Sequence, residues 1–154
     1  MIITPLSLFE VEYGVIVHGC NCSGGFGSGI ARQMKERYPI VEKVFRATPP
    51  CPELLGEIQV VKVTDDLFVV NAFTQNNYGH DGGKYADAGA IQTALKSAIR
   101  FANKIGHDIH VPKIGCGLGG LDWETDVKPI YTTLAMDALD HDMLFYVHDY
   151  KPLN

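Results

Sequence analysis

A short apolar run that opens into a glycine-dense loop constrains this chain more than any other stretch. Val15 to Val17 are apolar and predict a buried strand, and a polar loop rich in glycine follows up to Gly29. From Ile30 the sequence becomes helical in pattern. A strand, a glycine loop and a helix start together present backbone N–H groups to a phosphate. The spacing matches neither the Rossmann fingerprint nor the Walker A loop, so the stretch by itself indicates only a phosphate-containing ligand.

A second stretch of the same kind lies far downstream, at residues 111–123, where a strand runs into a glycine turn and then a helix. Most of the 16 glycines fall in three clusters, at residues 24–29, 79–83 and 115–120. Glycine lets a backbone bend sharply and approach a ligand closely. The clustering therefore predicts three loops gathered around one site.

Length and composition predict one ordinary globular domain spanning residues 1–154. Of the 154 residues, 46% are hydrophobic and 20% are charged, which is not the composition of a disordered chain. No apolar run approaches the roughly 20 residues that span a bilayer. The first residues, Met1 to Pro5, contain no basic segment, so we expect no signal peptide and a cytoplasmic location.

The net charge of −5 argues against tight nucleic-acid binding, which needs a basic footprint. It does not exclude a pyrophosphate ligand, because backbone amides can bind one. The four cysteines form no disulfide framework, so reduced thiols are expected. Cys20, Cys22 and His18 invite a zinc interpretation, but a fourth ligand at suitable spacing is missing. We therefore expect no metal. We also expect no cofactor and a monomer.

Strands alternate with helices along the chain, which predicts a three-layer α/β/α sandwich with a mixed central sheet. The clearest helix has Asp87 as N-cap and Gly106 as its stop, and Pro129 either kinks the last helix or starts its main part. The turn at Asp65 and Asp66 makes the flanking strands antiparallel. Strands are predicted at 2–4, 6–9, 15–18, 57–64, 67–73, 109–114 and 143–147, and helices at 30–38, 40–47, 88–105 and 125–139. Ligands in such sheets bind at the strands' carboxyl ends.

The sequences of the two glycine loops resemble those of the macrodomain family. The resemblance covers nearly the whole chain. His18-Gly-Cys-Asn21 and Gly27-Ser-Gly29-Ile-Ala31 are similar to the first ADP-ribose-binding loop of macrodomains, and residues 111–123 are similar to the second phosphate loop. The resemblance implies ADP-ribose or a derivative as ligand, with Asn21 on the distal ribose. The alternative is that Asn21 is a turn residue that caps its own backbone, and the presence of two such loops favours the ligand role. The implied ligand-binding residues are Asn21, Gly24, Gly25, Phe26, Gly27, Ser28, Gly29, Ile30, Ile114, Gly115, Cys116, Gly117, Leu118, Gly119 and Gly120.

His18 is expected to end its strand directly before the first loop. A histidine there can act as base, acid or nucleophile, or simply bond to backbone. The sequence His-Gly-Cys-Asn-Cys at residues 18–22 resembles the matching segment of yeast-type ADP-ribose 1''-phosphate phosphatases, in which the histidine is implicated in catalysis. The resemblance thus implies hydrolysis of ADP-ribose 1''-phosphate to ADP-ribose and phosphate, by His18 with Asp122 or Asp81 assisting. Asp122 is equally placed to cap a helix.

The segment at residues 71–87 is long and polar, and loops of this kind in compact domains are often functional. It is similar in wording to a bacterial and phage subgroup of macrodomains. Its polar side chains together form a candidate lid over the distal ribose. They are Tyr78, His80, Asp81, Lys84 and Tyr85.

Three departures from the family pattern leave alternatives open. Residues 5–10 replace the Gly-Asp-Ile-Thr segment that reads adenine, so Phe9, Tyr146 or Tyr150 would have to stack on the base. Macrodomains that use a lysine and an aspartate to remove ADP-ribose from glutamate differ at two further places. Gln75 follows Thr74 where they carry the lysine, and Gly119 stands where they carry the aspartate. The alternatives to the phosphatase are an ADP-ribosyl hydrolase acting on protein or nucleic acid, and a non-catalytic ADP-ribose reader.

Overall fold

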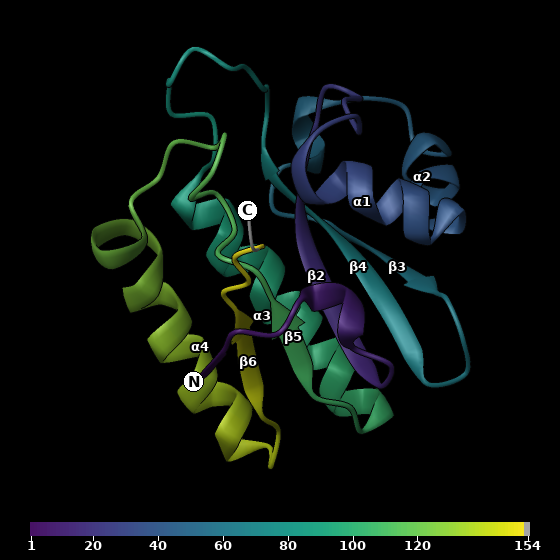
Figure 1. Ribbon diagram of the computed structural model, residues 1–154, viewed down its shortest axis with the longest axis vertical. Coiled ribbons are helices and arrows are strands. Elements are labelled where there is room, and N and C mark those ends of the chain that lie inside the picture. Colours follow the sequence, from purple (N-terminus) through teal and green to yellow (C-terminus); the bar gives the residue numbers. More distant parts are fainter. Residues whose placement is uncertain (153–154) are drawn as a thin grey trace.

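A single mixed sheet of six strands runs through the computed structural model, which describes residues 1–152 (Figure 1). Its strands lie in the order β1-β6-β5-β2-β4-β3. Their bounds are Ile2–Thr4 (β1), Gly14–Asn21 (β2), Ile58–Lys62 (β3), Leu67–Gln75 (β4), Ile109–Val111 (β5) and Phe145–His148 (β6). Only β3 runs antiparallel to its neighbour, β4, as the short turn between them predicts. The predicted mixed sheet is confirmed.

Helices cover both faces of this sheet, which confirms the three layers (Figure 1). Helices α3 and α4 pack on one face, and α1 and α2 pack on the other face over β2, β4 and β3. The helices are α1 (Gly29–Arg37), α2 (Pro39–Arg46), α3 (Ala88–Ile105) and α4 (Lys128–Asp140), with short turns η1 (Leu8–Glu10), η2 (Pro52–Leu54) and η3 (Trp123–Val127). No helix within residues 1–152 combines the length and apolarity that a membrane span requires.

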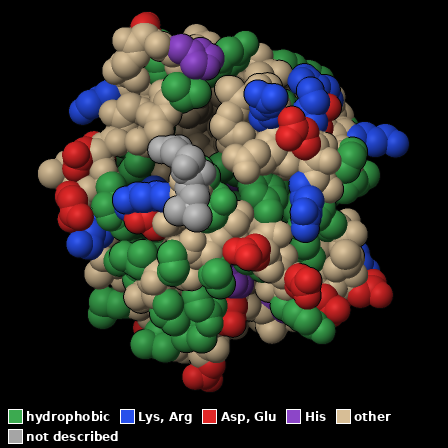
Figure 2. Space-filling model, viewed as in Figure 1, with side chains coloured by type: hydrophobic (Ala, Val, Ile, Leu, Met, Phe, Trp, Pro, Cys, Tyr) green, Lys and Arg blue, Asp and Glu red, His purple; other side chains and the backbone are tan. Residues whose placement is uncertain are grey.

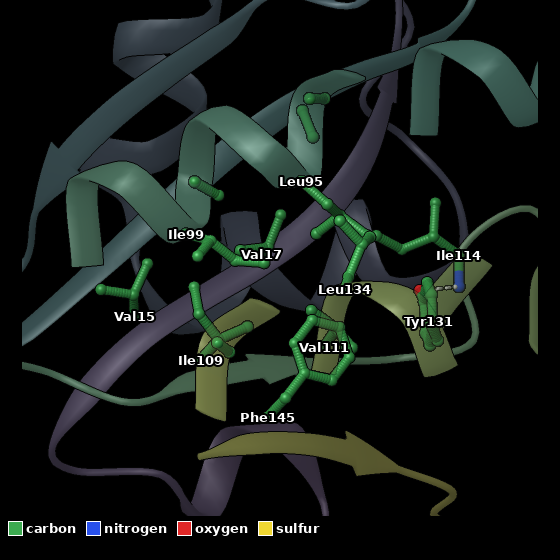
Figure 3. Packing of buried hydrophobic residues seen from close by; sticks show 14 of the residues in the cluster. Val15, Val17, Leu95, Ile99, Ile109, Val111, Ile114, Tyr131, Leu134 and Phe145 are labelled. Carbon is green, nitrogen blue, oxygen red and sulfur yellow. Dashed lines mark hydrogen bonds between the residues drawn. The ribbon is translucent and has the colours of Figure 1, made fainter. Parts of the chain in front are cut away.

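Strand alternation divides the core in two. On β2, Val15 and Val17 point into the core under α3 and α4, while Ile16 points into the core under α1 and α2. The larger core contains Leu95 and Ile99 of α3, and Figure 3 shows them against the strands. Because β2 is apolar on both faces, it lies at the centre of the sheet.

Several predicted boundaries need correction. The predicted strand at 6–9 is wrong, because Ser7 and Glu10 form a capping box that folds Leu8–Glu10 into a helical turn. The predicted strand at 109–114 ends at Val111, since Pro112 has no N–H to continue the ladder. Pro129 lies in the first turn of α4 and starts that helix, after one π-helical turn in η3. Asp87 and Gly106 cap α3 as predicted.

The first prediction concerns the larger core. Leu95→Ala should lower the free energy of unfolding by about 2–5 kcal/mol, because a fully buried side chain leaves a cavity. Leu139→Ala on α4, where the side chain is 62% exposed, should change stability by less than about 0.5 kcal/mol. Urea unfolding of both variants measures the difference, and equal losses would contradict this core assignment.

Candidate functional site

A cavity of about 580 Å³ opens where β2, β4 and the strand β5 reach their carboxyl ends. Three segments form its walls: the first glycine loop (residues 22–29), the middle loop (76–87) and the second glycine loop (112–121). Figure 2 shows a hollow near the top of this face, bordered largely by backbone and uncharged polar atoms. The three glycine clusters therefore meet at one site, as their spacing predicts.

Most of the residues implied as ligand-binding line this cavity. They are Asn21, Gly25, Phe26, Gly27, Ser28, Gly29, Ile30, Ile114, Gly115, Gly117, Leu118 and Gly119. Gly24, Cys116 and Gly120 lie outside the lining. The Cys116 thiol is half-buried and burial raises its pKa to about 11, so it is a neutral thiol. Gly120 packs against the backbone of Gly83 in the middle loop.

The cavity suits an anion held mainly by backbone. Among the described residues that line it, Lys113 is the only lysine or arginine, and none is Asp or Glu. The first turn of α1 lines the cavity from Ser28 to Ala31, and Ser28 makes no side-chain cap bond to this helix. The free N–H groups of a helix start favour negative charge. The Lys113 ammonium is held 3.1 Å from Asp149 Oδ2 and lies 4.9 Å from the ring centre of Trp123.

The side chain of Asn21 holds the first glycine loop. Its Oδ1 accepts from the backbone N–H of Gly25 at 2.9 Å and of Ser23 at 3.1 Å, and its Nδ2 donates to the Gly25 carbonyl at 2.8 Å. Arg46 of α2 donates to the Gly24 carbonyl at 3.1 Å. Asn21 is thus a loop-capping residue as well as a wall of the cavity, and the two interpretations of it are compatible.

Tyr131 of α4 holds the second glycine loop from below. Its buried hydroxyl accepts from the Ile114 N–H at 3.0 Å (Figure 3). The same hydroxyl donates to the Pro112 carbonyl at 2.7 Å. Gly115 has φ of +81°, which favours glycine, and its carbonyl accepts from Leu121 N–H at 2.8 Å. Hydrogen bonds to Tyr131, a residue of the larger core, therefore hold the second glycine loop in place.

The middle loop crosses the site and touches both glycine loops. The N–H groups of Tyr85 and Ala86 donate to the Gly119 carbonyl at 2.8 and 3.0 Å, and Tyr78 packs so closely on Gly25 that a Cβ there would lie 2.7 Å from its ring. Of the five residues predicted as a lid, Tyr78 and His80 line the cavity. The lining does not include Asp81, Lys84 or Tyr85.

His18 lies inside β2 rather than at its end, because pairing with β4 continues to Asn21. The expected strand end is therefore wrong. His18 is among the residues that line the cavity, but it is only 1% exposed, and Phe26 lies edge-on to its ring at 5.7 Å. Burial lowers the pKa of His18 to about 4, although its hydrogen bond to Asn71 opposes the shift. The imidazole is thus neutral at pH 7.

The two aspartates expected to assist His18 do not line the cavity. Asp122 caps η3: its Oδ1 accepts from Thr125 N–H at 2.9 Å and from the hydroxyl at 3.1 Å, which lowers the pKa of this exposed carboxyl. Asp81 accepts from the Tyr85 hydroxyl at 2.7 Å and from Gly83 N–H at 2.9 Å, with the same effect on its pKa. Of the three predicted catalytic residues, the structure brings only His18 to the cavity.

The residues considered for adenine stacking lie elsewhere. Phe9 packs 6.4 Å from the Tyr38 ring, and Tyr146 stacks on His110 at 4.8 Å in a separate apolar cavity of about 500 Å³. Tyr150 is exposed and lines neither cavity. Within residues 1–152, no three His, Cys, Asp or Glu side chains are grouped to hold a metal.

Sequence reasoning missed several contributors. Thr74, Gln75 and Lys113 line the cavity, and Arg46 braces the first loop from another element. Thr74 and Gln75 follow the predicted strand at 67–73, and that position was a usable signal, whereas Lys113 lies inside the predicted strand at 109–114. No local pattern marks Arg46, because its partner is 22 residues away.

A second prediction tests how tightly the second glycine loop is built. A Cβ at Gly119 would lie 2.7 Å from the Gly115 carbonyl oxygen and 2.9 Å from Ala86 Cβ, whereas one at Gly117 would meet nothing within 4 Å. Gly119→Ala should therefore destabilise the fold by about 1–3 kcal/mol, as overpacking does. Gly117→Ala is the matched control. Similar unfolding midpoints for the two variants would contradict this packing.

A third prediction concerns pH. The pKa of His110 is also lowered to about 4, by burial and by His148. Between 6.5 and about 4 the unfolded chain binds protons that the folded chain does not, so stability should fall as pH falls through this window. His110→Gln should make that fall shallower in urea unfolding series. A wild-type stability that stays constant across the window would contradict the burial of both rings.

Known proteins resemble this chain in sequence and in structure. A DNA ADP-ribosyl glycohydrolase of Mycobacterium tuberculosis is 31% identical over 144 residues, which cover 90% of this chain but only 40% of that protein. An ADP-ribose 1''-phosphate phosphatase of Lodderomyces elongisporus is 29% identical over 147 residues, covering 88% of this chain and 87% of that protein. The solved macrodomain of Mycobacterium tuberculosis DarG superposes with a TM-score of 0.75 at 27% identity, over 99% of both chains.

The family match agrees with the mixed sheet and with the two glycine loops that meet at one edge of it. Residues 17–130, most of the chain, match the Macro domain family and include the second half of β2, the first glycine loop, the middle loop and the second glycine loop. This chain therefore belongs to the macro domain family.

Proposed function

We propose that this protein binds ADP-ribose or a derivative of it in the cavity between the two glycine loops, and that it hydrolyses ADP-ribose 1''-phosphate to ADP-ribose and phosphate. The observation that carries the proposal is the cavity itself. Its volume of about 580 Å³ lies within the range of about 300–1,000 Å³ that is typical of small-molecule sites. Its walls include two glycine loops and the start of α1.

The charges of the lining favour a diphosphate ligand. The first turn of α1 offers free N–H groups, and no carboxylate among the described lining residues opposes an anion. Lys113 places an ammonium group at the start of the second glycine loop, where Asp149 Oδ2 at 3.1 Å partly balances its charge. The same preorganised donors would stabilise charge that develops on a transferred phosphoryl group.

His18 is the residue to which we assign the chemistry. A neutral imidazole can accept a proton from water, which then attacks phosphorus; the bond from phosphorus to the ribose oxygen breaks, and that oxygen takes up a proton from solvent. Asp122 and Asp81 have no part in this scheme, since their oxygens cap η3 and hold the middle loop.

Two observations bear on the second candidate, the removal of ADP-ribose from DNA. The M. tuberculosis glycohydrolase is similar over 90% of this chain, yet this chain spans only 40% of its length, whereas it spans 87% of the fungal phosphatase. Thr74 and Gln75 follow the apolar part of β4, where the lysine of a lysine-dependent hydrolase would lie. We therefore favour the phosphatase.

The fourth prediction separates these activities. His18→Gln keeps an N–H donor for Asn71 but removes the base, so phosphate release from ADP-ribose 1''-phosphate should fall by about 10²-fold or more. ADP-ribose affinity, measured by calorimetry, should stay within about 3-fold, because His18 is only 1% exposed. His141→Gln, at the exposed end of α4, is the control.

Three outcomes would contradict the assignment. Equal loss of binding and turnover in His18→Gln would show that His18 acts only through the fold. Release of ADP-ribose from ADP-ribosylated DNA, without phosphate release, would favour the glycohydrolase. ADP-ribose binding without either reaction would favour a reader.

A further inference from the structure

A chain of side-chain hydrogen bonds runs from helix α2 through β3 and β4 to His18 on β2. It starts at Gln59 on β3, whose Nε2 donates to the Val44 carbonyl at 3.3 Å and to Thr48 Oγ1 at 3.0 Å. Gln59 Oε1 accepts from Asn71 Nδ2 at 3.1 Å. Asn71, fully buried on β4, also donates from Nδ2 to the Val41 carbonyl at 3.4 Å.

The last link joins Asn71 to His18. The parallel register of β2 and β4 sets these two residues directly opposite one another, and Asn71 Oδ1 lies 2.5 Å from His18 Nε2. The chain therefore passes from backbone carbonyls of α2 through the side chains of Gln59 on β3 and Asn71 on β4 to His18 on β2.

The direction of each bond is fixed by the backbone carbonyls at the far end. A carbonyl oxygen can only accept, so the Val44 carbonyl requires the amide nitrogen of Gln59 and leaves Gln59 Oε1 to face Asn71. The Val41 carbonyl and Gln59 Oε1 then both require Asn71 Nδ2. Asn71 Oδ1 is left to face His18, and an oxygen there can only accept from Nε2–H.

This direction decides which nitrogen of His18 carries the proton. Burial keeps the ring neutral by lowering its pKa to about 4, and a neutral imidazole has one N–H. That N–H is on Nε2, so Nδ1 has a bare lone pair. Among the described residues, Nδ1 is the one buried side-chain nitrogen or oxygen without a hydrogen-bond partner. A buried polar atom of this kind needs a water or ligand to satisfy it.

We propose that Asn71 and Gln59 are positioning residues that lock His18 in the tautomer protonated on Nε2, so that Nδ1 is a preset acceptor for a hydrogen-bond donor bound in the cavity. The identity of that donor as the water that attacks phosphorus rests on the proposed function. When Nδ1 takes the water proton, the Nε2–H bond to Asn71 becomes charge-assisted and holds the imidazolium in place.

Two other histidines, His110 and His148, carry their protons on the opposite ring nitrogen. His148 Nδ1 lies 2.9 Å from the Leu6 carbonyl, which can only accept, so His148 carries its proton on Nδ1. His148 Nε2 then accepts from His110 Nδ1 at 2.8 Å. His110 and His148 are therefore both protonated on Nδ1, and they serve as internal references for His18.

Side-chain ¹⁵N NMR of the wild-type protein at pH 7 tests the assignment directly. We expect His18 to show a protonated Nε2 and an unprotonated Nδ1, and His110 and His148 to show the reverse. Saturating ADP-ribose should leave the His18 tautomer unchanged. A proton on His18 Nδ1, or rapid exchange between both nitrogens, would overturn the proposal without any variant.

Variants separate positioning from a merely structural role. Asn71→Leu removes the acceptor, so His18 should lose its tautomer preference, and kcat should fall by about 10-fold or more with KM little changed. Gln59→Leu, at a half-buried position, should have the same effect with a smaller amplitude. Unchanged tautomers and unchanged kcat in two folded variants would overturn the proposal.

Asn71→Asp provides a third readout, because a carboxylate beside His18 favours the imidazolium and so raises the pKa of His18. Two other side chains contact His18. Cys20 Sγ lies 3.7 Å from His18 Nε2, and burial raises the pKa of this thiol, so it is neutral. Phe26 is apolar, so neither residue offsets the new charge. Phosphate release by this variant should rise with pH near neutrality, where the wild-type rate is flat. The same flat profile in both proteins would overturn the proposal. If the wild-type tautomers are as stated but no phosphate is released, the proposed function fails and the tautomer assignment stands.

Discussion

The parallel pairing of β2 with both β4 and β5 is the constraint on which the rest of the structure depends. It brings the carboxyl ends of these strands to one edge of the sheet, and the loops that leave them form the cavity. It also sets His18 opposite Asn71. A shift of one residue in this register would turn His18 to the opposite face of the sheet, into the larger apolar core.

The glycine loops supply backbone groups, but side chains from other elements hold those loops in shape. Asn21 and Arg46 fix the first loop, and Tyr131 fixes the second from the middle of α4. The middle loop then joins the two through Gly119 and Gly25. Binding by backbone requires this support, because flexible glycines lose entropy when they are ordered.

Much of the fold could be predicted from local sequence because its signals are local. Periodicity marks α3, the caps at Asp87 and Gly106 mark its ends, and prolines mark the starts of α2 and α4. Features that arise from pairing between distant segments could not be predicted in this way.

The wrong strand at residues 6–9 has a different cause, because its signal was local. The apolar residues around Leu8 suggested a strand, although the Ser7 and Glu10 capping signature was present in the sequence.

The same distinction applies to the site. Glycine clustering was sufficient to gather the three loops at one cavity, because loops that leave neighbouring parallel strands meet. The environment of His18 was not predictable from its neighbours in sequence. Its burial, its tautomer and its partner Asn71, 53 residues away, follow only from the register of β2 and β4. Asp122 had two interpretations, and its bonds to Thr125 show that it caps η3.

The proposed function requires the cavity between the glycine loops to bind ADP-ribose through backbone N–H groups. Backbone amide NMR during a titration with ADP-ribose tests it most directly. We expect saturable shifts concentrated in residues 22–31 and 112–121, with little change in the N-terminal segment at residues 2–13. Shifts centred on that N-terminal segment, or no saturable shifts at millimolar ligand, would contradict it.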